Sequence, residues 1–331
     1  MNSSAIASIA AIFFNAAPVI FALVGETLTE RAGVINLSLN GSILLTAMVG
    51  FAVAFTTHSF IAGFLAAAVV GALVALLIAF FSITLKQSQV AVGYVLTLTC
   101  KSLAYFLGTP FLFSQVIQLP LMKIPLLSDI PILGPILFSQ NIMVYFSYIL
   151  IVVAFIWIFR TRGGLVLRGV GERPAAAFVR GANVNRIRYI YTGIGGALVG
   201  ISGAIYSLSV KPGWAGQTSG LDGFGWIILA ITIFGGWNPI RGALGAYLFA
   251  FLQQLGVILQ QSLPNINFRI FQVAPFPLMI LTLLFVNIGD AEWVQRTLAG
   301  LPEDARRVIA GILRAMRTRP PAALGTPFEN E

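Results

Sequence analysis

The chain has 331 residues, of which 58% are hydrophobic and only 9% are charged. Soluble globular domains carry about 25% charged residues, so this composition excludes an ordinary soluble domain and indicates a membrane protein. The net charge is +9, but nucleic acid is excluded as a partner because no basic patch interleaves with exposed aromatic side chains.

Apolar runs long enough to span a bilayer, roughly 20 residues each, recur along the chain. They lie near residues 5–25, 36–57, 59–85, 90–108, 141–159, 190–210, 223–240, 242–261 and 270–288. The predicted fold is therefore an all-α polytopic membrane protein with about nine transmembrane helices, or roughly 8 to 10. No basic segment precedes the first run, so we expect a retained span and not a signal peptide.

Two arginine-rich segments set the orientation of these spans. Seven arginines lie between Arg160 and Arg188, and six more lie between Arg296 and Arg319. Lys and Arg are in excess in cytoplasmic loops, so both segments are predicted to be cytoplasmic. Residues 1–290 then form the transmembrane domain with a cytoplasmic loop at 160–189, and residues 291–331 form a cytoplasmic tail.

The segments outside the spans differ in character. Arginines at helical spacing in the tail predict an amphipathic helix on the inner membrane surface, with disorder beyond Arg319. On the outer side, segment 109–140 contains five prolines, a density that no long regular helix tolerates. We expect this segment to form an extended cap over the outer mouth.

The first turn between spans is charged. Glu26, Glu30 and Arg31 stand between the first two apolar runs. Because ionisable side chains are costly at the centre of a bilayer, we expect them in an aqueous cytoplasmic turn with local pairing.

A short sequence signature occurs twice. "NLSLNGSILLTA" at 36–47 resembles "SGLDGFGWIILA" at 219–230, with Leu39-Asn40-Gly41 matching Leu221-Asp222-Gly223. The predicted orientation places the first signature at the cytoplasmic side and the second at the outer side, so their spans run in opposite directions. This arrangement indicates an inverted repeat, an architecture common among membrane transport proteins.

The residues around both signatures are candidates for a substrate pathway. Gly and Asn at a span start permit a broken or late-starting helix, whose free N–H groups and partial positive charge can hold polar substrate groups. Helix capping by Asn and Ser is the alternative, and both roles can coexist. Aromatic side chains near the outer mouth could stack on a flat base, although an aromatic interface belt is the alternative and is favoured for Trp214. The candidate pathway residues are Asn36, Ser38, Asn40, Gly41, Phe111, Phe113, Asp222, Gly223, Phe224 and Trp226.

The arginine-rich loop contains a predicted short helix. Pro174 suits the first helical position, Ala175 to Ala177 favour continuation, and Gly181 supplies a stop. A short helix between two spans has no core of its own to fill, so its Phe178 side is predicted to enter a groove of a partner protein. Anchoring to lipid headgroups is the alternative use of the same arginines.

Three ordered motifs carry a family resemblance over most of residues 20–290. They are "ETLTERAGVINLSLNG", "GVGERPAAAFVRGANVNRIRY" and "GFGWIILAITIFGGWNPIRGALGA". Together they resemble the permease family of bacterial ATP-binding-cassette importers for simple sugars, branched-chain amino acids and nucleosides, and most closely its shorter nucleoside-type permease. Two departures stand out: the family usually has an acidic residue in N-L-G-x-E-G where this chain has Ser38 and Asn40, and Arg173 precedes Pro174 where the family usually has Asn.

The resemblance implies a set of partners in the bacterial inner (cytoplasmic) membrane. A second, longer permease would pair with this chain, ABC ATPase subunits would dock on the cytoplasmic loop, and an extracytoplasmic lipoprotein would deliver a small-molecule substrate. The residues expected to couple to the ATPase are Gly171, Glu172, Arg173, Pro174, Ala175, Ala176, Ala177, Phe178, Val179, Arg180 and Gly181. The sequence leaves open whether the chain pairs with itself or with a different permease.

The chain is not expected to be an enzyme or to hold a cofactor. No G-x-x-x-x-G-K-[ST] motif occurs, so ATP and Mg²⁺ would belong to the partner ATPase, and no catalytic or metal-binding cluster is predicted. The expected function is alternating access for nucleosides or related heterocycles, with riboflavin, simple sugars and branched-chain amino acids as alternatives. An ion-coupled transporter would need acidic residues within its spans, and Lys101 is the one ionisable residue placed well inside a span.

Overall fold

A computed structural model describes residues 3–115, 117–262 and 320–328, together with residues 277 and 281. Its helices are α1 (Ser3–Arg31), α2 (Leu39–Thr57), α3 (Phe60–Ala79), α4 (Gln89–Leu107), α5 (Leu133–Leu137), α6 (Ile142–Arg160), α7 (Arg162–Glu172), α8 (Pro174–Val179), α9 (Val184–Ile205), α10 (Phe224–Phe234) and α11 (Pro239–Ser262). Single π-helical turns extend α3 (Phe80–Thr84) and α9 (Tyr206–Val210), and 3₁₀ turns occur at Thr109–Phe111 and Gly216–Ser219. The strands are β1 (Leu121–Lys123) and β2 (Ser139–Asn141).

Eight helical segments in the described part of the chain are long and apolar enough to cross a membrane. They correspond to the first eight predicted spans, so the prediction of an all-α polytopic membrane protein is confirmed. The predicted ninth span near 270–288, and the tail up to residue 319, lie almost entirely outside the described residues.

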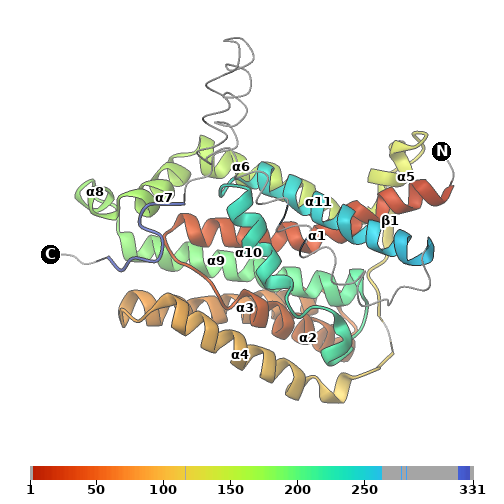
Figure 1. The fold of residues 1–331 in the computed structure, drawn as a ribbon, viewed down its shortest axis with the longest axis horizontal. Helices are drawn as coiled ribbons and strands as arrows, with labels where there is room; N and C mark the ends of the chain where they lie inside the picture. Colours follow the sequence, from red (N-terminus) through yellow and green to blue (C-terminus); the bar gives the residue numbers. More distant parts are fainter. Residues whose placement is uncertain (1–2, 116, 263–276, 278–280, 282–319, 329–331) are drawn as a thin grey trace, which may run out of the picture.

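The two ends of the helical bundle carry different segments. Figure 1 shows α7, α8 and the segment 320–328 at one end, and α5, β1 and the N-terminus at the other. The arginine-rich loop and the proline-rich segment therefore lie at opposite ends, as the predicted orientation requires. In the described part of the proline-rich segment no helix exceeds the five residues of α5, and β1 pairs with β2 in antiparallel register.

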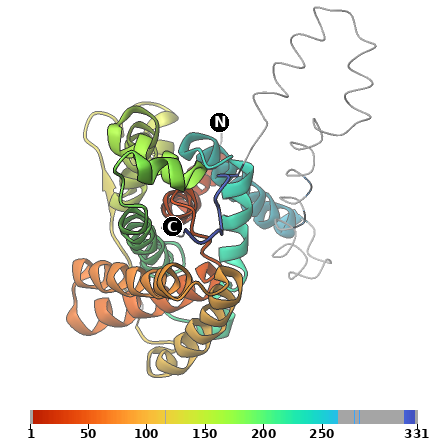
Figure 2. The ribbon, with the colours of Figure 1, turned by 90° about the vertical axis from the view of Figure 1, so that its left-hand side faces the viewer.

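The core forms where α1, α2, α3 and α9 pack together. Viewed along the bundle, α1 lies near its centre, with α9, α2 and α3 beside it (Figure 2). Glycines allow the backbones to approach closely: a Cβ atom on Gly71 would lie 2.3 Å from the carbonyl oxygen of Gly196. Such small-residue contacts replace the hydrophobic drive that lipid removes. They hold the helices that position the site described below.

The charged residues after the first span do not form an aqueous turn, so that prediction is wrong. Helix α1 continues through Arg31, and the Glu26 and Glu30 side chains are only 0% and 3% exposed. The helix can continue because other parts of the chain, described below, supply hydrogen-bond partners for these groups. Their burial in protein replaces the expected solvation by water.

The end of the chain also differs from expectation. Residues 320–328 lie against the end of the bundle that carries α7 and α8, where the N–H of Ala323 donates to the Gly171 carbonyl oxygen (2.9 Å). Disorder beyond Arg319 is therefore wrong for this stretch. The reason is a set of backbone hydrogen bonds and a buried alanine, which sequence periodicity does not reveal.

Candidate functional site

The starts of two helices meet inside the bundle. Helix α2 begins at Leu39 and runs toward the end that carries α5 and β1, whereas α10 begins at Phe224 and runs toward the end that carries α7 and α8. With 11 residues, α10 is only about 16 Å long, roughly half the thickness of the hydrocarbon core. The second signature therefore lies within the bundle beside the first, and not at the outer surface as expected. Helix α10 is the late-starting helix.

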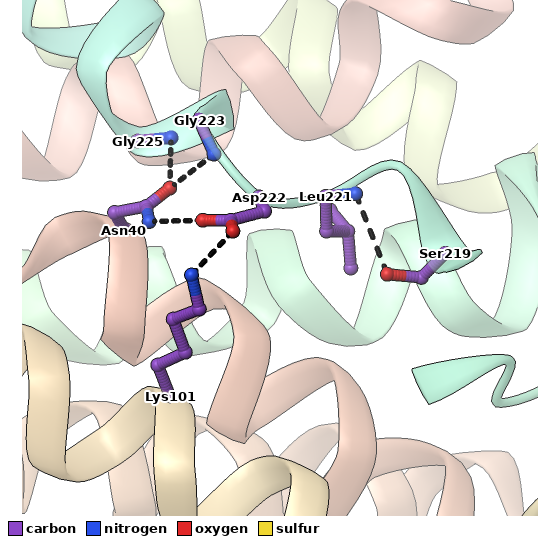
Figure 3. Close-up of polar contacts among 7 residues, drawn as sticks. All are labelled: Asn40, Lys101, Ser219, Leu221, Asp222, Gly223 and Gly225. Carbon is purple, nitrogen blue, oxygen red and sulfur yellow. Dashed lines mark hydrogen bonds and ion pairs between the residues drawn. The ribbon is translucent and has the colours of Figure 1, made fainter. Parts of the chain in front are cut away.

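Asn40 joins these two helix starts (Figure 3). Its Oδ1 atom accepts hydrogen bonds from the backbone N–H groups of Gly223 (2.8 Å) and Gly225 (3.4 Å). Its Nδ2 atom donates to Oδ1 of Asp222 (2.9 Å). Because the cap residue of α10, Gly223, has no side chain, Asn40 from the other half of the chain takes the capping role across the interface.

Two glycines make this contact possible. Gly223 has a φ of +92°, a left-handed conformation that only glycine adopts without strain. At Gly225 a Cβ atom would lie 2.3 Å from the backbone nitrogen of Asn40. A side chain at either position would disturb the junction of α2 and α10.

An ion pair completes the site. The Lys101 ammonium group of α4 binds the Asp222 carboxylate, and Lys101 lies about 18 Å along α4 from Gln89. The two side chains keep 33% and 45% of their surface exposed. Charges at this depth are costly and mark substrate or ion pathways. A single lysine inside a span needs a counter-ion. From the sequence, this requirement could have suggested Asp222 as the partner of Lys101.

A cavity of about 180 Å³ lies next to this site and includes Leu221 in its lining. Its lining combines aromatic and polar side chains with backbone: Phe113, Ser114, Tyr206, Ser207, Lys211, Pro212, Gly213, Trp214, Ala215, Thr218, Ser219 and Leu221. The Ser219 carbonyl oxygen accepts hydrogen bonds from the Tyr206 hydroxyl (3.2 Å) and the Lys211 ammonium group (3.3 Å). Burial lowers the pKa of the Lys211 ammonium group. Since Leu221 precedes Asp222, the cavity and the ion pair adjoin along the chain.

The predicted aromatic residues have different surroundings. Phe113 lines the cavity and is 85% exposed, whereas Phe224 is buried in the core. Phe111 packs edge-on against Phe55, at a centroid distance of 6.4 Å, and Trp226 is an exposed residue of α10. Only Phe113 of the four predicted aromatics reaches the cavity.

Trp214 is the aromatic residue that sequence reasoning set aside. Its side chain is 3% exposed, lines the cavity and stacks near Tyr105, with centroids 6.3 Å apart. A belt residue at the membrane interface would stay exposed, so that interpretation is wrong for Trp214.

Three other predicted pathway residues shape the backbone around Asn40. The Asn36 side chain accepts from the backbone N–H and the hydroxyl of Ser38 (3.2 and 2.7 Å), and thereby fixes the loop before α2. At Gly41 a Cβ atom would lie 2.2 Å from the carbonyl oxygen of Thr97, so this glycine lets α2 approach α4. Asn36, Ser38 and Gly41 position Asn40, and the described contacts place none of them on Asp222 or Lys101.

The charged side chains of α1, buried Glu30 and half-buried Arg31, hold the turn that follows α10. The Trp237 indole N–H donates to the Glu30 carboxylate. Arg31 donates to the carbonyl oxygens of Gly236 (3.3 Å) and Trp237 (3.1 Å), and Glu26 accepts from the Asn36 N–H (3.3 Å). Both ends of α10 are therefore tied to α1 or α2. Sequence reasoning missed this link because its partners are 205 or more residues apart.

The predicted coupling residues lie together at the arginine-rich end. Gly171 and Glu172 end α7, Arg173 separates the helices, and α8 covers Pro174–Val179, with Arg180 and Gly181 after it. Helix α8 contains no buried residue, and Val179 is 85% exposed. Docking of an ATPase on this surface stays a prediction.

Comparisons with known proteins identify relatives over most of the chain. The family model for the permease component of branched-chain amino acid transport systems matches residues 8–283. The nucleoside ABC transporter permease protein NupC of Lactococcus lactis is 33% identical over 279 residues, which cover 80% of this chain and 87% of NupC. The guanosine ABC transporter permease protein NupQ of Bacillus subtilis is 35% identical over 298 residues, 83% and 91% of the two chains. An ABC transporter permease protein of Haloferax volcanii that is named for glucose is 35% identical over 236 residues, 70% and 71% of the two chains. No solved structure matches this chain.

Proposed function

The chain belongs to the family of permease components of branched-chain amino acid transport systems, and from this premise we propose that it imports nucleosides. It is a multi-pass permease of the ATP-binding-cassette importer type in the cytoplasmic membrane, with ATPase and substrate-binding partners. The substrate and the identity of a second permease are parts of the proposal. Two relatives whose names give nucleosides or guanosine support this substrate class.

The junction of Asn40, Asp222 and Lys101 is the observation that carries the proposal. It offers hydrogen-bond donors and acceptors, and a partly exposed ion pair, deep within the span of α4. Base edges and ribose hydroxyls need both kinds of group. The adjoining cavity provides Phe113 and Trp214 for stacking; base–aromatic stacking contributes about 1–3 kcal/mol per base in nucleic-acid binders.

The same contacts suggest how the path opens and closes. In the state described here, Asn40 joins α2 to α10 and so closes the route between the two helix starts. Separation of these helices would free the N–H groups of Gly223 and Gly225 and the Asp222 carboxylate. Polar groups of a passing substrate would then take the place of Asn40. Movement of α8 by a docked ATPase would supply the force, and this chain would contribute no ATP site.

Glucose is the second candidate substrate, because one relative is named for glucose. Sugar hydroxyls suit the same polar junction but gain less from stacking in the cavity. A second, different permease as partner is part of the nucleoside proposal, since the resemblance to the shorter nucleoside-type permease carries that pairing.

An uptake assay tests the proposal. The chain is purified with its partner permease and its ATPase and reconstituted in proteoliposomes with its binding protein, and ATP-dependent uptake of labelled guanosine is measured. Unlabelled inosine, adenosine, glucose, riboflavin and leucine compete in parallel. We expect nucleosides alone to compete; competition by glucose without competition by inosine overturns the substrate assignment. Uphill uptake by a preparation without ATPase would overturn the importer mechanism.

A further inference from the structure

The segment 320–328 crosses the cytoplasmic end of the bundle between α8 and the turn after α1. It is the blue segment of Figures 1 and 2, and it lies beside α7 and α8 in both views. We propose that this segment, here called the strap, transmits movement of α8 to the start of α2 and thereby to Asn40. The inference rests on the proposed function, because it assumes that a partner moves α8.

Backbone hydrogen bonds tie the strap to two elements at once. The N–H of Ala323 donates to the carbonyl oxygen of Gly171 in α7 (2.9 Å), and the N–H of Gly325 donates to that of Gly33 in the α1–α2 turn (3.1 Å). The N–H of Ala322 donates to the Glu172 carboxylate (3.3 Å). The end of α7 and the α1–α2 turn are therefore both hydrogen-bonded to the same short segment of chain.

A buried arginine adds a third element. The Arg188 side chain of α9 is 1% exposed, and its Nη1 atom donates to the Thr326 carbonyl oxygen (2.9 Å). A guanidinium group is costly to bury. Its burial beneath the strap therefore indicates a stable contact between α9 and the strap. Gly33, with a φ of +92°, leaves room here: a Cβ atom on it would lie 3.0 Å from Arg188 and 3.2 Å from the Ala323 carbonyl oxygen.

The C-terminal end of the strap, at Phe328, reaches α8 itself. The rings of Phe178 in α8 and Phe328 in the strap pack with centroids 5.7 Å apart. Both rings line a pocket of about 410 Å³ at the end of α8. Because α8 contains no buried residue, this aromatic contact is a principal attachment of α8 besides its connection to α7.

The middle of the strap is linked to Asn40 through the α1–α2 turn, which Gly325 contacts at Gly33. From Gly33 the chain runs through a short turn in which the Ile35 N–H donates to the Gln89 side chain (2.7 Å) and the Asn36 N–H donates to Glu26 (3.3 Å). Helix α2 and Asn40 follow directly. A turn held by such contacts moves as a unit, so displacement of Gly33 is passed to Asn40 and not absorbed by a flexible loop.

Two neighbouring alanines provide a matched test. Ala323 is buried, at 7% exposure, whereas Ala322 is exposed. Ala323→Lys places a long charged side chain under the strap and displaces it, and Ala322→Lys adds the same charge on the outside. The full-length chain is purified with its partner permease, its ATPase and its binding protein, and uptake, ATP hydrolysis and amide hydrogen exchange of residues 320–328 are measured.

For Ala323→Lys we expect the ATPase to co-purify at wild-type level and faster exchange in the strap. Uptake per ATP hydrolysed should fall about tenfold, within the usual range of coupling between distant sites. Ala322→Lys should match wild type in all three measurements. Wild-type uptake per ATP in Ala323→Lys, despite a released strap, overturns the proposal. Loss of the ATPase from that variant also overturns it, because the strap would then be a docking element.

A second variant tests the same proposal if Ala323→Lys folds poorly. Phe328→Ala removes the contact with Phe178 and keeps the backbone hydrogen bonds, so it should lower uptake per ATP while exchange at Ala323 and Gly325 stays slow. Unchanged uptake per ATP in this variant overturns the transmission role. If no ATPase co-purifies with the wild-type chain, that result refutes the proposed function instead. In that case the strap is judged by exchange alone, and fast exchange of residues 320–328 refutes it.

Discussion

Replacement of Asn40 by leucine is the most direct perturbation of the junction between α2 and α10. Leucine has a similar size but cannot accept the hydrogen bonds from Gly223 and Gly225 or donate to Asp222. A buried N–H without a partner costs about 1–3 kcal/mol. Gly225 is buried and Gly223 is half-buried. With the full range for the N–H of Gly225 and the low end of it for that of Gly223, the loss of stability is about 2–4 kcal/mol.

This energy stabilises the state in which α2 and α10 touch. If that state is one of two that alternate during transport, loss of this energy shifts the ratio of the two populations by roughly 30- to 1,000-fold, at 1.4 kcal/mol per factor of ten. We therefore expect Asn40→Leu to abolish ATP-dependent uptake in proteoliposomes and to lower the midpoint of thermal unfolding.

Asn141→Leu is the control that separates stability from transport. Asn141 is 0% exposed, accepts a hydrogen bond from the Val144 N–H (3.1 Å) and donates to Ser209. Its loss should destabilise the protein to a similar extent, but it does not join α2 to α10. Below the unfolding transition, uptake should survive in Asn141→Leu. Equal uptake by the two variants would refute the role assigned to Asn40.

The other predictions concern the charges and the close contacts. Asp222→Asn and Lys101→Met should each abolish most uptake because each leaves one charge unpaired, and the double variant should regain part of it; a double variant as inactive as the singles would contradict pairing as their main role. Gly41→Ala should cost about 1–3 kcal/mol, the usual range for overpacking, because its Cβ atom would lie 2.2 Å from a backbone oxygen. Gly169→Ala, with nothing within 4 Å, should leave the unfolding midpoint unchanged or raise it, and equal shifts in the two variants would argue against the close contact. Trp237→Phe removes the hydrogen-bond donor to a buried carboxylate. The free energy of unfolding should fall by about 1–3 kcal/mol and the unfolding midpoint with it; an unchanged midpoint would contradict that contact.

The sequence was sufficient for the eight spans that the structure describes, and it singled out the two signatures, although it placed them at opposite membrane surfaces. Spans of about 20 apolar residues are a local property, and lipid imposes them directly on composition. The match between Leu39-Asn40-Gly41 and Leu221-Asp222-Gly223 also identified the two segments that the structure brings together. It did not predict their common depth, because a span count assumes that every span begins at a membrane surface. Helix α10 begins inside the bundle.

Contacts between distant segments were beyond sequence reasoning. Glu26 and Glu30 resemble turn residues until Asn36 and Trp237 are known to supply their partners. The composition of residues 320–328 resembles a disordered tail until Gly33 and Gly171 are known to accept their backbone hydrogen bonds. In each case the stabilising groups are backbone atoms or single side chains from elsewhere in the chain. Periodicity and charge patterns contain no information about such partners.

The unequal side chains of the two signatures follow from the charges around them. Asn40 replaces an acidic residue that is usual at its position in the resembled family, whereas Asp222 is acidic and faces Lys101. Two carboxylates at this junction would repel each other with one lysine to compensate, and two amides would leave Lys101 without a counter-ion. One amide and one carboxylate satisfy Lys101 and the N–H groups of α10 together. The departure at Asn40 and the lysine within α4 are therefore best understood as one feature.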